Sequence, residues 1–303
     1  MLDEGEAMQQ TLPQATTVAR RNARVRRSAG TVVAHTLLLV TAALFVIPFI
    51  WLVITSLKPT NQIFTDPLIW LPRPILWSNY AKALTSPAFP FVRLLTNTLY
   101  YAVLSTIGTV LSSAVVAYAF ARMEFRGRNV LFAITLATMM LPGIVTLIPT
   151  YVLFRFFGWV GSYAPLIMPT FFGAAFNIFL LRQFMMTIPG DLTDAAYVDG
   201  AGDFTILWRI MLPLVKPALL VVGLFQFLYA WNDFQGPLIY LDKATDFPLV
   251  LGLYAFQTSR GMTVEWNLMM AAALATTFPI IVLFFIAQRY FIEGIALTGL
   301  KGV

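Results

Sequence analysis

The chain has 303 residues, of which 59% are hydrophobic and only 11% are charged, and it contains no cysteine. Soluble domains carry roughly 25% charged residues, so this composition excludes an ordinary soluble protein. It also excludes intrinsic disorder, which needs low hydrophobicity and high charge. The lack of cysteine excludes disulfides and thiolate metal sites. The formal charge of +6 indicates a membrane protein with a basic inner face rather than a protein that binds nucleic acid.

Long intervals without charged residues mark segments that can cross about 30 Å of hydrocarbon. Five intervals carry no charge and another is interrupted only by Asp233; in chain order they cover residues 28–57, 94–121, 129–154, 156–181, 217–241 and 266–288. Each is expected to be a helix, because an isolated helix satisfies its own backbone polar groups in lipid. The sequence therefore predicts an all-α, multi-pass membrane protein with six transmembrane helices.

The distribution of basic residues predicts the orientation of these helices. Five arginines between Arg20 and Arg27 directly precede the first span, which indicates a cytoplasmic N-terminus. With six crossings, the loops after the second and fourth spans and the C-terminus are then also cytoplasmic. We expect a cytoplasmic tail over residues 1–30 and one transmembrane domain over 31–303, with the first span retained as a signal anchor.

Three loops are longer than a hairpin needs. The loop over residues 58–90 is expected outside the cell as a folded cap rather than a helix, because it contains six prolines. A second loop, over 185–216, is predicted to be cytoplasmic, and a third, over 242–265, to lie outside. A chain that only anchored itself would not need a structured inner loop, so the second loop is the predicted functional region.

Several kinds of chemistry are absent from the sequence. There is no phosphate-binding loop, so the chain is not expected to hydrolyse nucleotide, and His35 has no second histidine with metal-ligand spacing. The spans lack the embedded charges that ion-coupled transporters usually need, with the exception of Asp233. Two interpretations of Asp233 remain open: it faces protein or water inside the membrane, or it is solvated at the outer end of its span.

The inner loop has clear local signals. Pro189 and Gly190 end the preceding helix, Asp191 is a predicted N-cap, and a helix of about two turns should stop at Gly200, where φ can be positive. Asp203 is predicted to cap a second helix. The short helix would present small side chains, Ala195 and Ala196, beside acidic groups that can pair with a partner's Arg or Lys. An interfacial helix lying on lipid is the alternative, but such helices are usually cationic.

This loop resembles the EAA loop of ABC-importer permeases, whose family form is E-A-A-x-x-x-G followed by an apolar helix and L-P-x-x-x-P. The matching stretches are Asp194-Ala195-Ala196, Asp199-Gly200-Ala201 and Leu212-Pro213-Leu214-Val215-Lys216-Pro217. Asp194 stands where Glu is usual, which keeps the charge with one methylene less reach. The resemblance places the EAA loop at about residues 185–217.

Other stretches are similar to the smaller six-span permease of carbohydrate importers of the maltose-transporter type. They are Ser56-Leu57-Lys58-Pro59, Asn79-Tyr80, Ala121-Arg122, Phe125-Arg126-Gly127-Arg128-Asn129, Trp231-Asn232-Asp233-Phe234, Pro237-Leu238 and Gly299-Leu300-Lys301-Gly302. The resemblance covers nearly everything after about residue 35. It implies a permease subunit that forms half of the transmembrane path for a sugar or sugar-like solute in the inner membrane of a prokaryote.

The resemblance also implies the partners. They would be a second homologous permease, two ATPase subunits that bind ATP and Mg²⁺ in place of this chain, and an extracytoplasmic sugar-binding protein. The predicted docking residues for an ATPase are Asp191, Asp194, Ala195, Ala196, Tyr197, Asp199, Gly200 and Gly202. The predicted contacts for the binding protein are Gln257, Arg260 and Glu265.

A hydroxyl-rich solute is recognised by amides and an aromatic face. The candidates along the path are Asn177, Gln226, Trp231, Asn232 and Asp233. Buried Asn and Gln also hold helices together in lipid, so that structural role stays open for each amide. The alternative function for the whole chain is a self-sufficient secondary transporter or channel for a small polar solute.

Overall fold

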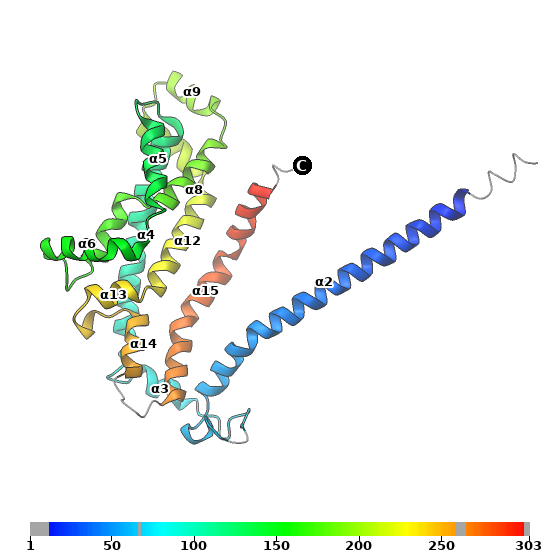
Figure 1. Cartoon of the computed structure of the whole chain (residues 1–303), viewed down its shortest axis with the longest axis vertical. Helices are drawn as coiled ribbons and strands as arrows, with labels where there is room; N and C mark the ends of the chain where they lie inside the picture. The colour runs from blue at the N-terminus through cyan, green and yellow to red at the C-terminus, as the bar shows by residue number, and fades with distance from the viewer. Residues whose placement is uncertain (1–11, 66–67, 259–264, 300–303) are drawn as a thin grey trace, which may run out of the picture.

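The computed structural model describes residues 12–65, 68–258 and 265–299, and the side chains of residues 31–65, 68–258 and 265–288. All regular elements in these ranges are helical (Figure 1). Four helices in the described part are long and apolar enough to span a membrane: Thr31–Ser56, Phe91–Arg122, Ala164–Met186 and Trp266–Gln288. Two bent helix pairs raise the number to six if each pair forms one span. The all-α prediction is therefore confirmed, but two predicted spans are broken.

Helix α4 (Phe91–Arg122) packs against both α8 (Ala175–Met186) and α12 (Lys216–Asn232). Its buried residues include many small ones, among them Ser105, Gly108, Ser113, Ala114 and Ala117. A Cβ atom added at Gly108 would lie 2.4 Å from Oγ1 of Thr170, in the short helix η2 (Met168–Phe172). Only glycine lets these two segments approach so closely. Small residues are therefore what allows α4 to contact several neighbours at once.

Helix α2 (Leu12–Ser56) is continuous from the predicted N-terminal tail into the first span, so no structural break occurs at residue 30. It contacts α15 (Trp266–Gly299) near the end of the bundle that carries α3, and then diverges from the rest of the molecule (Figure 1). The side chains of residues 31–50 are all exposed. An apolar helix of this kind has lipid or another protein as its surroundings.

The third predicted span is divided into α5 (Arg128–Thr138) and α6 (Gly143–Phe156), which meet at an angle of 98°. Pro142 directly precedes α6, and proline lacks the N–H that would continue α5. The fourth predicted span begins too early, because residues 157–163 lie outside helices. Its helical part comprises α7 (Ala164–Ile167), η2 and α8.

The fifth predicted span, 217–241, is too long. Helix α12 ends at Asn232, and the separate helix α13 (Gln235–Tyr240) follows. Before α12, the three short elements α10 (Asp203–Ile206), η3 (Leu207–Met211) and α11 (Leu212–Leu214) form one bent arm at 81° to it. Pro213 and Pro217 account for this bend, since neither can donate a helical hydrogen bond.

Two loops contain more helix than expected. The loop over 58–90 includes η1 (Thr60–Gln62) and α3 (Ser78–Leu84), so the expectation of a cap without helix is wrong at α3. The loop over 242–265 includes η4 (Ala244–Asp246) and α14 (Leu249–Thr258), and Leu249 and Phe256 belong to the core. Asn79 in α3 is buried and donates hydrogen bonds to the carbonyl oxygens of Ser56 (2.9 Å) and Lys58 (3.0 Å). This side chain ties the first loop to the end of α2.

Replacing Asn79 by alanine should leave both carbonyl oxygens without their partner in a buried site. We expect Asn79→Ala to lower the free energy of unfolding by about 1 to 3 kcal/mol. Thermal unfolding in detergent measures the effect. Asn129→Ala, at an exposed amide, is the matched control and should change stability by about 0.5 kcal/mol or less. Equal stability of the two variants would contradict a stabilising role for the Asn79 hydrogen bonds.

Candidate functional site

Two regions of the structure contain clusters of polar side chains outside the hydrophobic core. The first is the α9 segment, defined as residues 190–203, which lies at the end of the bundle opposite α3 (Figure 1). The second is an open cavity of about 560 Å³ beside α13, which we call the α13 cavity. Among the described residues, no group of three His, Asp or Glu side chains could hold a metal ion.

Helix α9 runs from Asp191 to Val198, which confirms the predicted two-turn helix. Gly200 follows with φ of +82°, a left-handed conformation that glycine adopts without strain. The predicted caps are wrong. Gly190 is the N-cap and makes no side-chain cap hydrogen bond, and Gly202 rather than Asp203 precedes α10. The acidic residues are therefore in the first turns, where their charge still complements the helix dipole.

The two faces of α9 differ in burial. Thr193 and Ala196 are 5% and 8% exposed, and Ala196 belongs to a core cluster with Leu181, Met185 and Ile206. The other predicted docking residues are exposed: Asp191, Asp194, Ala195, Tyr197, Asp199, Gly200 and Gly202. The expectation that Ala196 faces a partner is therefore wrong, because it anchors α9 to its own chain. The acidic side chains remain available.

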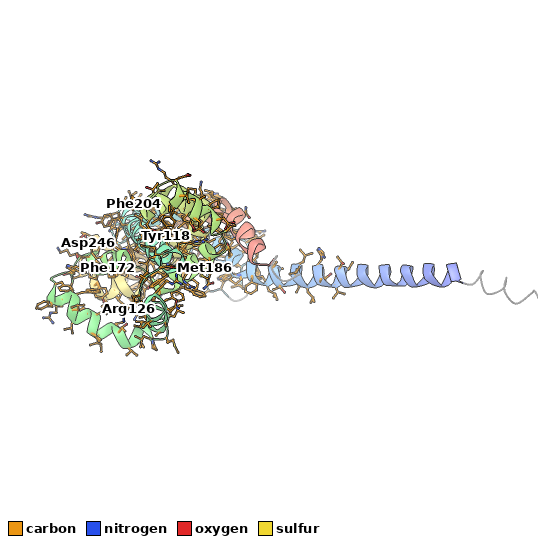
Figure 2. All side chains as sticks on the ribbon, turned by 90° about the horizontal axis from the view of Figure 1, so that it is seen from above. Tyr118, Arg126, Phe172, Met186, Phe204 and Asp246 are labelled. Carbon is orange, nitrogen blue, oxygen red and sulfur yellow. The ribbon has the colours of Figure 1, made fainter. Side chains whose placement is uncertain are left out.

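An exposed apolar surface, which the sequence did not predict, lies around this helix. Val198 is 88% exposed, Phe204 is 73% exposed and Leu192 is 45% exposed. The ring of Phe204 lies 5.9 Å from that of Trp208, and Figure 2 shows Phe204 at the rim of the molecule, viewed from above. Apolar side chains beside exposed carboxylates are typical of a protein-binding surface. The sequence shows that these residues are apolar. Whether they are exposed depends on how the arm formed by α10, η3 and α11 packs after α9.

Asp203 connects the α9 segment to α4. Its Oδ1 atom accepts hydrogen bonds from the hydroxyl groups of Tyr197 (2.5 Å) and Tyr118 (3.2 Å). The hydrogen bond to Asp203 and, after it, burial raise the pKa of Tyr197 above its usual value. The phenol therefore stays protonated and remains a donor at neutral pH.

The α13 cavity combines hydroxyl, amide and aromatic groups. Its polar lining consists of Tyr101, Thr109, Thr146, Thr150, Thr170, Gln226, Tyr229, Asp233, Gln235 and Tyr240. Asp233 accepts a hydrogen bond from the Tyr101 hydroxyl at Oδ2 (2.8 Å) and from the Gly236 N–H at Oδ1 (3.0 Å). The carboxylate thus contacts protein and lines an open cavity directly after the end of α12.

Only two of the five predicted path residues, Gln226 and Asp233, line this cavity. Trp231 is 2% exposed and its ring lies 5.6 Å from that of Phe227, so it belongs to the core. Asn177 is buried in α8, and Asn232 is exposed and donates to its own helix at the carbonyl of Leu228 (2.8 Å). On α12, helix geometry explains the difference, because Gln226 lies five and six positions before Trp231 and Asn232 and therefore faces another direction.

The cavity also includes residues that sequence reasoning did not find. Tyr101 and Thr150 come from helices distant in sequence, and nothing in the chain indicates that Tyr101 meets Asp233, 132 positions away. Of the predicted contacts for a binding protein, Gln257 is half-buried in α14 and Glu265 is half-buried just before α15. Arg260 and the Lys301 tail lie outside the described residues.

The chain matches known transport proteins over most of its length. Residues 110–296 match the family described as "Binding-protein-dependent transport system inner membrane component". The sn-glycerol-3-phosphate transport system permease protein UgpE of Yersinia pestis is 31% identical over 265 residues, covering 86% of this chain and 94% of that protein. The arabinooligosaccharides transport system permease protein AraQ of Bacillus subtilis is 31% identical over 261 residues, covering 86% and 92%.

Solved structures agree with the sequence matches. A chain of a bacterial ABC transporter involved in the import of the acidic polysaccharide alginate superposes with a TM-score of 0.78 at 25% identity, covering 86% of this chain and 95% of that one. A second alginate transporter chain, solved with a periplasmic protein bound to an alginate pentasaccharide, shares the fold with a TM-score of 0.62. This chain belongs to the family of inner membrane components of binding-protein-dependent transport systems, and it is a multi-pass permease subunit of an ABC importer.

Proposed function

We propose that this permease forms half of the transmembrane path for a sugar or sugar-like solute, together with a second homologous permease. Two separate ATPase subunits, which bind ATP and Mg²⁺, drive the transport, and an extracytoplasmic binding protein delivers the solute. The proposal places both termini and the α9 segment in the cytoplasm of a prokaryotic cell. The basic residues before the first span support this orientation.

The main support for the proposal is that one face of α9 is buried and the other is exposed. Thr193 and Ala196 fix the helix to its own chain, while Asp191, Asp194 and Asp199 remain exposed beside apolar Val198. A partner that covers this face needs basic groups for the carboxylates and an apolar contact for Val198. An ATPase surface with arginine or lysine around an apolar cleft meets both requirements.

The lining of the α13 cavity supports an uncharged, hydroxyl-rich solute. Among the described residues, Asp233 is the only charged side chain in the lining, and its negative charge disfavours anionic solutes such as glycerol phosphate or alginate. Tyr101, Tyr229 and Gln226 supply the ring faces and amide that carbohydrates need. Among the relatives, the transporter of arabinooligosaccharides therefore offers the better guide to the solute.

Two substitutions in the α9 segment test the docking role. Gly200→Pro is incompatible with φ of +82°, and Asp194→Arg reverses a charge on the exposed face. Both variants should insert into the membrane but separate ATP hydrolysis from solute uptake, measured in proteoliposomes that contain the complete importer. Glu124→Arg reverses another exposed charge near the same end, outside the α9 segment, and should leave coupling unchanged. Normal solute uptake together with normal binding-protein-stimulated ATPase activity in both variants would refute the assignment.

Reconstitution in proteoliposomes also distinguishes an importer subunit from a self-sufficient transporter or channel. The chain reconstituted alone should take up no solute, because it depends on ATPase and permease partners. Purification from the native membrane should recover an ATPase and a second permease with it. Uptake by the isolated chain would favour the alternative.

A substitution of Gln226 tests whether the α13 cavity is part of the solute path. Gln226→Ala removes one amide from the cavity, and we expect the uptake rate of the complete importer to fall about two- to tenfold, the effect of one hydrogen bond. Asn232→Ala is the matched control on the same helix, since its amide lies outside the cavity and should not affect uptake. Equal uptake rates for the two variants would exclude Gln226 from the path.

A further inference from the structure

The last turns of α4 hold the α9 segment at both of its ends. Tyr118 and Arg122 lie one turn apart on the same face of this helix. The Tyr118 hydroxyl donates to Oδ1 of Asp203, just after α9, at 3.2 Å. Arg122 donates to the carbonyl oxygens of Met185 (2.6 Å) and Ile188, just before α9. One face of α4 therefore contacts the chain on entering and on leaving α9.

Asp203 is the junction of this arrangement. Its carboxylate joins Tyr118 of α4 and Tyr197 of α9 while it begins α10. A hydrogen bond to an ionised carboxylate is stronger than one between neutral groups. The three elements are therefore held together by one side chain.

The contacts between these elements leave little freedom for α9 to move alone. Tyr118, Ala196 and Ile206 are buried in one core cluster, with Met185 from the end of α8. Arg182 of α8 donates from Nε to the carbonyl oxygen of Phe120 at 3.2 Å, so α4 and α8 each bind the other's terminal carbonyls through arginine. A dense and mutually hydrogen-bonded cluster transmits displacement rather than absorbing it.

The middle part of α4 lines the α13 cavity with Tyr101 and Thr109. Tyr101 lies 17 residues before Tyr118, about 25 Å along the axis at 1.5 Å per residue, and it donates to Asp233 in the cavity lining. Helix α4 is continuous over its 32 residues and contains no proline. One unbroken helix thus connects the hydrogen bonds of the α9 segment to those of the cavity.

We propose that α4 is the rigid link that carries movement of the α9 segment to the α13 cavity, and that Tyr118, Arg122 and Asp203 are the positioning residues that attach α9 to it. The inference rests on the proposed function, because the ATPase subunits supply the movement. When they draw the α9 helices together, α4 moves with α9, and the Tyr101–Asp233 contact in the cavity moves with α4.

The number of solute molecules transported per ATP hydrolysed tests the link in proteoliposomes containing the complete importer. Tyr118→Phe removes one hydrogen bond and should lower this ratio about two- to tenfold. Asp203→Ala removes the acceptor of two hydrogen bonds and should lower the ratio at least as much. Asp203→Asn should keep part of the ratio, because its amide oxygen still accepts a hydrogen bond. The double variant Tyr118→Phe/Asp203→Ala should be no worse than Asp203→Ala alone, since the two groups act through one interaction.

Tyr100→Phe is the matched control. Tyr100 is on the same helix and is 54% exposed, and within the described part of the chain its hydroxyl has no hydrogen-bond partner, so the ratio should not change. An unchanged ratio in Tyr118→Phe and Asp203→Ala, with a coupled wild-type importer, overturns the link. A wild-type complex without stimulated ATPase activity instead overturns the proposed function. If Asp203→Ala does not assemble, Tyr118→Phe decides alone, because it keeps the buried ring.

Discussion

The close packing of α4 against its neighbours is the constraint on which the rest of the structure depends. In lipid, helices gain little from hydrophobic burial against one another, so they associate through van der Waals contact and hydrogen bonds. Gly108 permits the approach of η2, and Ser112 donates to the carbonyl oxygen of Thr170 at 2.9 Å. With these contacts in place, α8 and α12 lie on α4 and carry the α9 segment and α13 at fixed distances from it. A larger residue at Gly108 would collide with Thr170 and Phe171 and displace η2.

The few charged groups have defined positions in this scaffold. Asp233, within the fifth predicted span, has both oxygens occupied by hydrogen-bond donors of its own chain, which hold the half-exposed carboxylate in place. Asp203 is likewise satisfied by two tyrosines. Asp191, Asp194 and Asp199, in contrast, are exposed. Satisfied carboxylates therefore hold the chain together, and exposed ones remain for a partner.

Local signals were sufficient to predict some elements closely. The helix Asp191–Val198 and the positive φ of Gly200 follow from Pro189, Gly190 and Gly200, residues that act on their own stretch of backbone. The angles of 98° and 81° inside two predicted spans did not follow. Proline indicates that a helix is interrupted, but the direction of the next helix depends on what it packs against. For the same reason Asp203, expected to be a helix cap, instead binds tyrosines from two other helices.

The sequence by itself determined the solvent, the helical class, the number of apolar segments and the place of the acidic loop, because hydrophobicity, charge and glycine or proline act locally. Only the tertiary structure decided which side chains meet. It turned Ala196 inward and placed Val198 at the surface, it separated Gln226 from Trp231 and Asn232, and it joined Tyr101 to Asp233. These outcomes depend on the rotation of each helix about its own axis. That rotation is set by contacts between residues far apart in the chain, which no local pattern encodes.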